Sequence, residues 1–169
     1  AAYSILNDAP DRRRGYMANN MVFGDIMSDD TDKGGGGAND GQDAGALELF
    51  NIFTDNRTIE RKWDATYEGI TRANLVIENV HQIDMDEDAR DIIVGEAKFL
   101  RAYHYFQLVR IWGGVPLITT VLTPDELNQP RATEEAVWEQ IETDAGEAAD
   151  LLEPDNDIGR ATKGAALAL

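Results

Sequence analysis

The chain has 169 residues, a formal net charge of −17 and no cysteine. This length is enough for one domain with a real hydrophobic core. The negative charge argues against nucleic-acid binding, which needs a basic face toward the phosphates. Disulfides and thiolate metal sites are excluded, and only His81 and His104 offer imidazole. We therefore expect no metal site and no cofactor.

The surface is expected to be strongly acidic. Few of the basic residues are lysines, namely Lys33, Lys62, Lys98 and Lys163. An acidic surface poor in lysine keeps halophilic proteins soluble at salt concentrations that screen their self-repulsion. We expect a halophilic protein, with an ordinary acidic domain as the alternative. No apolar run is long enough to span a bilayer, and no signal peptide opens the chain.

The first third of the chain has little periodicity. Residues 1–6 have the pattern of a helix end that stops before Pro10. Residues 29–45 are rich in Asp, Gly and Asn and predict a loop. Residues 46–53 fit either a short helix or an extended segment.

The loop over residues 29–45 contains a weak calcium-like pattern. Asp30, Asp32 and Gly34 have the right alternation, but the twelfth position, where a bidentate glutamate is required, is Gly41. A solvated loop is the better interpretation, and we assign no metal to it.

From about Thr58 onward the pattern is helical. The first long helix carries Trp63 and Asn74 on one apolar face, at spacings of three and four. Asn74 falls inside this face, so we expect its amide to be buried and hydrogen-bonded to backbone or to a neighbouring helix.

A second helix is predicted over residues 86–112. Between Phe99 and Trp112 its apolar residues cover nearly every side, which is typical of a helix buried among others. Asp84 and Glu87 have capping-box spacing at its start. Gly113-Gly114 and then Pro116 end it.

Charged residues lie inside this helix. Arg101 is the best candidate for a buried ion pair, with Glu96 or with a carboxylate of another helix as its partner. His104 has no nucleophile or ordered carboxylate at a telling spacing, so we interpret it as a packed core histidine. Thr133 and Thr162 are predicted to be the N-caps of two further helices. Pro154 is expected to end the first of these helices.

The sequence EAKFLRA at residues 96–102, followed by Tyr105-Phe106, Leu108-Val109, Trp112-Gly113 and Val115-Pro116-Leu117, resembles the hallmark of the SusD/RagB family. GDIMSDD at residues 24–30 is similar to a second family segment, and Trp63 with Ala73-Asn74 to a third. Members are helical nutrient-binding lipoproteins of the Bacteroidetes outer membrane.

The resemblance implies a mostly α fold, a tetratricopeptide-like helical repeat scaffold of long antiparallel helices with an irregular, loop-rich N-terminal third. Residues 1–169 would be the N-terminal portion of a SusD-like domain, with an irregular region at about 8–57, a helical scaffold at about 58–169 and the C-terminal part absent. In this scheme Trp63, Asn74, Arg101, Phe106, Trp112 and Pro116 have structural roles.

The resemblance also implies a function: binding a glycan or other nutrient at the cell surface and presenting it to a TonB-dependent, SusC-like transporter. The protein would be a surface-exposed outer-membrane lipoprotein, held to the membrane only through a lipid anchor outside this chain. Since the tryptophans have core register, the candidate ligand-binding residues are those of the irregular third, namely Tyr16, Phe23, Asp29, Asp30, Phe50 and Phe53.

Two other functions are open. A generic helical-repeat scaffold that docks a protein or peptide would need the same helices. An enzyme, such as a glycosidase with two carboxylates, would need carboxylates in apolar helical positions flanked by aromatics, and the sequence marks none. We therefore predict no catalytic residues.

Overall fold

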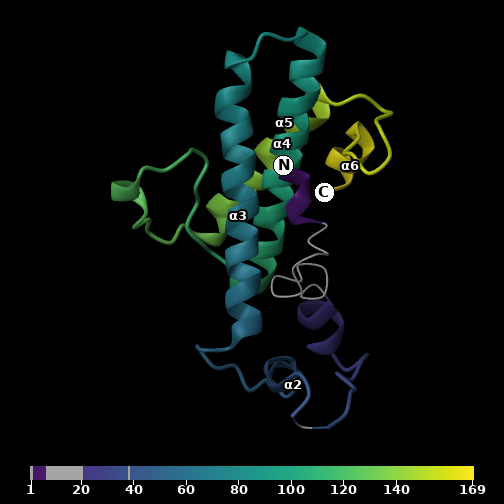
Figure 1. The fold of residues 1–169 in the computed structure, drawn as a ribbon, viewed down its shortest axis with the longest axis vertical. Coiled ribbons are helices and arrows are strands. Elements are labelled where there is room, and N and C mark those ends of the chain that lie inside the picture. The colour runs from purple at the N-terminus through teal and green to yellow at the C-terminus, as the bar shows by residue number, and fades with distance from the viewer. Residues whose placement is uncertain (1, 7–20, 38) are drawn as a thin grey trace. The chain divides into compact units, whose positions relative to one another are not determined.

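A computed structural model describes residues 2–6, 21–37 and 39–169. These residues are mostly helical (Figure 1). They contain no strand, and extended pairing among them is limited to a bridge between Pro116 and Arg131. The chain divides into two compact units, which we call unit 1 (Ala1–Tyr3 with Thr66–Leu169) and unit 2 (Ser4–Ala65).

Unit 2 is built on one small apolar cluster. It contains the π-helix η2 (Val22–Ile26), helix α2 (Gln42–Glu48) and the first residues of α3 (Arg57–Asn79). Val22, Ile26 and Leu47 are buried together, so η2 and α2 pack against each other. The ambiguous residues 46–53 divide at Glu48, where α2 ends and a turn begins.

Unit 1 contains the long helices. They are the rest of α3, then α4 (Glu87–Trp112), α5 (Glu134–Leu151) and the short α6 (Lys163–Ala168), with 3-10 turns η3 (Val80–Gln82) and η4 (Pro124–Glu126). A further 3-10 turn, η1 (Ala2–Ile5), opens the described chain. Helices α4 and α5 pack along each other, and α6 packs on α5.

Helix α4 holds the centre of unit 1, as the sequence predicts. Its fully buried large side chains include Leu100, Tyr105 and Leu108. The expectation of burial on all sides is only partly met, because Phe106 and Trp112 remain half-exposed. Phe106 packs edge-to-face on Trp138 of α5, with ring centroids 5.8 Å apart, so it lies at the margin of the core.

The start of α4 agrees with the predicted range, but the cap is not the one that the capping-box spacing indicates. The N-cap is Asp86, whose carboxylate accepts a hydrogen bond from the Ala89 amide at 3.1 Å, and Asp84 is not the cap. The physical reason lies in the preceding turn, where the Arg90 guanidinium donates to the carbonyl oxygens of Ile83 and Met85. Arg90 thus binds the turn that ends at the N-cap Asp86, and the helix begins at Glu87.

The end of α4 agrees with the prediction. Gly113 takes a positive φ of 67°, and a Cβ at Gly114 would lie 2.2 Å from the Ala132 carbonyl oxygen. Both positions therefore need glycine. The Arg131 side chain covers the end by donating hydrogen bonds to the carbonyl oxygens of Trp112 and Gly114.

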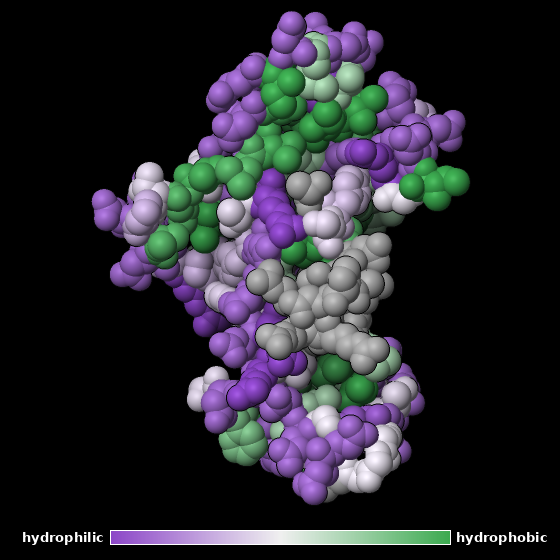
Figure 2. Space-filling view, in the orientation of Figure 1, coloured by the Kyte–Doolittle hydropathy of each residue, from purple (hydrophilic) through white to green (hydrophobic). Residues whose placement is uncertain are grey.

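The two threonine caps are also confirmed. The Thr133 hydroxyl accepts from the Ala136 amide, and the Thr162 hydroxyl accepts from the Ala165 amide, each at 3.2 Å. Figure 2 shows many hydrophilic side chains on the face turned to the viewer, with hydrophobic groups between them, as expected for a chain of this charge.

Candidate functional site

The predicted ligand-binding residues fall into four groups. Tyr16 lies outside the described residues. Phe23 is half-buried and packs on the apolar cluster of unit 2, so it is mainly a core residue there. Asp29 and Asp30 are exposed at the start of the glycine-rich loop.

The remaining two residues, Phe50 and Phe53, lie in an exposed apolar turn that we define as residues 49–53. Four of its five side chains are large and hydrophobic, with exposed fractions of 69% for Leu49, 65% for Phe50, 60% for Ile52 and 60% for Phe53. Single exposed apolar residues need no explanation, but several in succession make this turn a candidate interaction surface.

The backbone holds this turn in a strained conformation. Phe50 donates from its amide to the Leu47 carbonyl at 3.0 Å, and Asn51 donates to the Ala46 carbonyl at 2.8 Å. These two bonds form a Schellman motif at the end of α2, in which the left-handed position is usually glycine. Here it is Phe50, at φ 54°. A bulky residue in this region is strained, and such strain is concentrated at functional sites.

A buried amide ties the far side of the turn to the helices. Asn56 is 4% exposed, and its Nδ2 donates to the Asp43 carbonyl in α2 at 2.9 Å. Its Oδ1 accepts from the amides of Thr58 and Ile59, which caps the start of α3. The turn is therefore bounded on both sides by fixed backbone.

Two of the predicted structural residues, Asn74 and Arg101, form a buried polar network in unit 1. The Arg101 guanidinium donates from Nε and Nη2 to both oxygens of Asp144 in α5, each at 2.7 Å. Its Nη1 donates to Asn74 Oδ1 in α3 at 2.8 Å. The partner of Arg101 is thus a carboxylate of another helix, one of the two alternatives left open by the sequence.

The same network fixes the segment that follows α4. Arg101 Nη1 also donates to the Thr119 carbonyl, and Asn74 Nδ2 donates to the carbonyls of Ile118 and Thr120. The hydroxyls of Tyr67 and Tyr105 donate to the carbonyls of Pro116 and Ile118 at 2.8 and 2.9 Å. Residues 116–120 thus satisfy buried polar groups of α3 and α4, which identifies this network as structural.

Glu96 and His104 also have structural surroundings. Glu96, the other proposed partner of Arg101, instead accepts from Arg160 at 2.5 Å and from Asn156 at 2.9 Å. His104 is fully buried, with its ring edge-on to Tyr103 at 6.0 Å. Its ring lies against Gly69 of α3, which agrees with the interpretation as a core histidine.

Two members of the apolar turn, Leu49 and Ile52, were not predicted as ligand-binding residues. The run Leu-Phe-Asn-Ile-Phe at residues 49–53 could have indicated them, because it is too apolar for a solvated loop. Whether this run lies in the core or on the surface could be decided only once the end of α2 was known.

Across the described ranges no group of His, Asp and Glu side chains is placed to hold a metal ion. Within those ranges, too, none of the helices has the length and hydropathy to cross a bilayer.

Comparison with known proteins gives one consistent result. Residues 14–169 match a SusD-like family model described as "Starch-binding associating with outer membrane". A SusD-like protein of Formosa agariphila is 34% identical over 150 residues, which cover 88% of this chain and 27% of that protein. The chain therefore spans about a quarter of the length of this relative.

Solved structures agree with this result. A laminarin-binding SusD-like protein superposes with a TM-score of 0.84 and 33% identity over 98% of this chain and 37% of its own. A structure described as being with xylogluco-oligosaccharide gives a TM-score of 0.72 and 29% identity over 91% of this chain and 30% of its own. The predicted mostly α, tetratricopeptide-like fold class is confirmed. The chain belongs to the SusD-like family.

Proposed function

We propose that the chain is part of a glycan-binding protein of the outer-membrane surface, and that the apolar turn at residues 49–53 contributes a binding surface. The observation that supports this most strongly is the family match over residues 14–169, together with likeness to structures whose names record laminarin and xylogluco-oligosaccharide binding. The protein would be anchored by a lipid outside this chain and present its ligand to a TonB-dependent, SusC-like transporter.

The chemistry of the turn suits a sugar ligand. Sugar rings stack on exposed aromatic faces, while nearby polar groups orient their hydroxyls. Phe50 and Phe53 supply two exposed rings. Asp29 and Asp30 are exposed carboxylates of the same unit, and we propose that they contribute hydrogen-bond acceptors. The role of this chain is then binding and not catalysis.

Calorimetric titration of the protein with laminarin and xyloglucan oligosaccharides tests this proposal. Because two rings offer few contacts, we expect dissociation constants of about 1 mM, equivalent to roughly −4 kcal/mol. Phe50→Gly and Phe53→Ala should abolish the heat. The first substitution suits the left-handed backbone, so the loss cannot be attributed to a strained turn.

A matched control is Ile158→Ala, which removes an exposed apolar side chain from unit 1. It should leave the titration unchanged. Undiminished binding in both phenylalanine variants would exclude the turn as the ligand surface. Absence of heat with every glycan tested would count against glycan binding by this chain.

A further inference from the structure

The glycine-rich loop of unit 2 closes around a lysine side chain. The Lys33 ammonium donates hydrogen bonds to the carbonyl oxygens of Gly34 at 2.9 Å and of Asp40 at 2.5 Å. Carbonyl oxygens of a loop are ligands that hard cations prefer. A lysine ammonium is a compact charge with three donors, so it can bridge such oxygens in a similar way.

A second contact within the loop involves the carboxylate of Asp40. The Gly36 amide donates to Asp40 Oδ2 at 3.0 Å. A Cβ at Gly35 would come 2.3 Å from the same Oδ2, so the chain passes too close for a side chain at that position. Residues 33 and 40 are thus joined through the ammonium, and the Asp40 carboxylate binds Gly36 between them.

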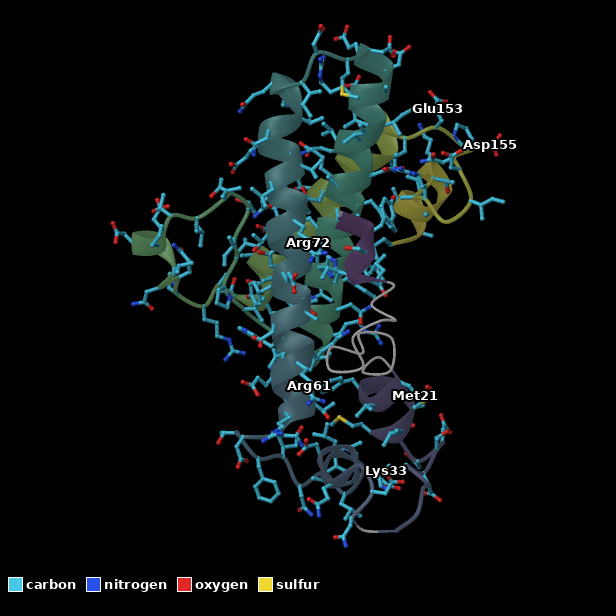
Figure 3. All side chains as sticks on the ribbon, in the orientation of Figure 1. Met21, Lys33, Arg61, Arg72, Glu153 and Asp155 are labelled. Atoms are coloured by element: carbon cyan, nitrogen blue, oxygen red, sulfur yellow. The ribbon has the colours of Figure 1, made fainter. Side chains whose placement is uncertain are left out.

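Lys33 is also attached to α2. Its backbone amide donates to Glu48 Oε1 at 3.2 Å, at the end of that helix. Its stem lies along the helix, where a Cβ at Gly45 would be 3.1 Å from Lys33 Cε and one at Gly41 would be 3.7 Å from Cδ. Figure 3 shows the Lys33 side chain beside α2.

These contacts matter because α2 leads directly into the apolar turn. The helix runs only from Gln42 to Glu48. A helix this short is not stable without tertiary contacts. Leu47 supplies apolar contacts on one side, through the cluster with Val22 and Ile26. Lys33 supplies polar contacts near both ends of the helix: its ammonium donates to the Asp40 carbonyl just before the N-cap Gly41, and its backbone amide donates to Glu48.

We infer that Lys33 is a positioning residue of the candidate glycan surface: its ammonium fixes the loop that leads into α2, and through this loop and α2 the strained turn that carries Phe50 and Phe53. The predicted effect of Lys33 on glycan affinity rests on the proposed function. The closure of the loop by Lys33 stands independently of any ligand, so the two claims can be tested separately.

The test is chemical rescue of Lys33→Ala by n-propylammonium. This amine has the same atoms, from Cγ to Nζ, that the substitution removes. NMR amide exchange at Gly36 and Asp40 reports the loop, and titration with laminarin oligosaccharides reports binding. We expect faster exchange at both amides and affinity weakened about tenfold, the effect of losing a charged hydrogen bond. Added n-propylammonium should reverse both changes, whereas neutral n-propanol should not.

Lys98→Ala is the matched control, because it removes the same charge from a partly exposed pair with Glu147 in unit 1. It should change neither readout. Unaltered exchange in Lys33→Ala, or changes that propanol reverses as well as the amine, would overturn the role of the ammonium. Faster exchange with unweakened affinity would overturn the positioning role. If the unsubstituted protein binds no glycan, the proposed function fails, and the exchange measurement still decides the closure of the loop.

Discussion

At the residue scale, the best-defined feature is the buried charge of Arg101. Its side chain is 6% exposed and that of Asp144 is 0% exposed, so neither charge is solvated by water. The pair is held by bidentate contact through Nε and Nη2, and Nη1 donates to Asn74 and to the Thr119 carbonyl. Removing one partner would leave the other as an uncompensated buried charge.

We therefore predict that Asp144→Ala lowers the free energy of unfolding by about 3–5 kcal/mol. Glu147→Ala, one turn later on the same helix, breaks the Lys98 pair, in which the glutamate side chain is 52% exposed. It should cost about 0–1 kcal/mol. Denaturant titration measures both, and similar losses would contradict the burial of the Arg101 pair.

The hydroxyls of Tyr67 in α3 and Tyr105 in α4, which bind the segment after α4, predict that the stability of the fold depends on pH. Burial raises the pKa of Tyr105, against the opposing effect of its hydrogen bonding with Ile118, and burial also raises the pKa of Tyr67. In the unfolded chain both hydroxyls titrate near pH 10. The folded protein keeps its protons to higher pH, so stability from these groups is complete below about pH 10 and is lost above it.

Unfolding free energies measured from pH 8 to 11 should thus fall above about pH 10. Tyr105→Phe removes one titrating group and should make this fall shallower, although its stability at pH 8 is lower by about 1 kcal/mol through the lost hydroxyl contact. An equally steep fall in the variant would show that Tyr105 does not cause the effect.

At the element scale, features that depend on residues close in the sequence were predicted more accurately than features that depend on distant contacts. The caps at Thr133 and Thr162 and the stop at Gly113 depend on neighbouring residues, and they were predicted correctly. Capping-box spacing alone did not identify the cap of α4, because Asp84 and Asp86 both precede the helix and Asp86 is the one that accepts from the Ala89 amide. The choice between them depends on the backbone of the preceding turn, where Arg90 donates to the carbonyls of Ile83 and Met85.

The candidate site was predictable only in part for the same reason. Phe50 and Phe53 were identified as unused aromatics, but their exposure depends on where α2 ends. The left-handed conformation of Phe50 could not be predicted, because glycine is the usual residue in that position. Likewise, the choice of Asp144 over Glu96 for Arg101 required the packing of α4 on α5.

Two helical glycines, Gly69 in α3 and Gly146 in α5, are predicted to respond in opposite ways to substitution by alanine. A Cβ at Gly69 would lie 2.2 Å from His104 Nε2, whereas a Cβ at Gly146 of α5 would meet nothing within 4 Å. Gly69→Ala should destabilise the fold by about 1–3 kcal/mol through overpacking. Gly146→Ala should stabilise it by about 1 kcal/mol, because alanine is the better helix former.

Thermal or denaturant unfolding of these two alanine variants distinguishes the sites. Stabilisation by both substitutions would mean that α3 and α4 do not approach closely at Gly69. The comparison is well matched, since both glycines lie inside helices and gain the same methyl group.

At the scale of the whole molecule, the dominant property is the net charge of −17. Such an excess of one sign destabilises a compact state through self-repulsion. The halophilic character inferred from composition stays a prediction. Salt reduces the screening length from about 10 Å at 0.1 M to about 3 Å at 1 M, so the repulsion should weaken over this range.

The midpoint of thermal unfolding should therefore rise steadily from low salt to molar sodium chloride. Sodium chloride is preferable to sulfate here, because sulfate also strengthens apolar burial. A midpoint that does not change with salt would contradict the halophilic interpretation and favour an ordinary acidic domain.

The apolar turn at residues 49–53 is proposed to contribute to glycan binding. An NMR titration with laminarin oligosaccharides, followed at each backbone amide, measures this contribution residue by residue. We predict saturable shifts at Phe50, Phe53 and the exposed Asp29 and Asp30, with a midpoint of about 1 mM. Shifts confined to unit 1, or none at that concentration of ligand, would contradict the account.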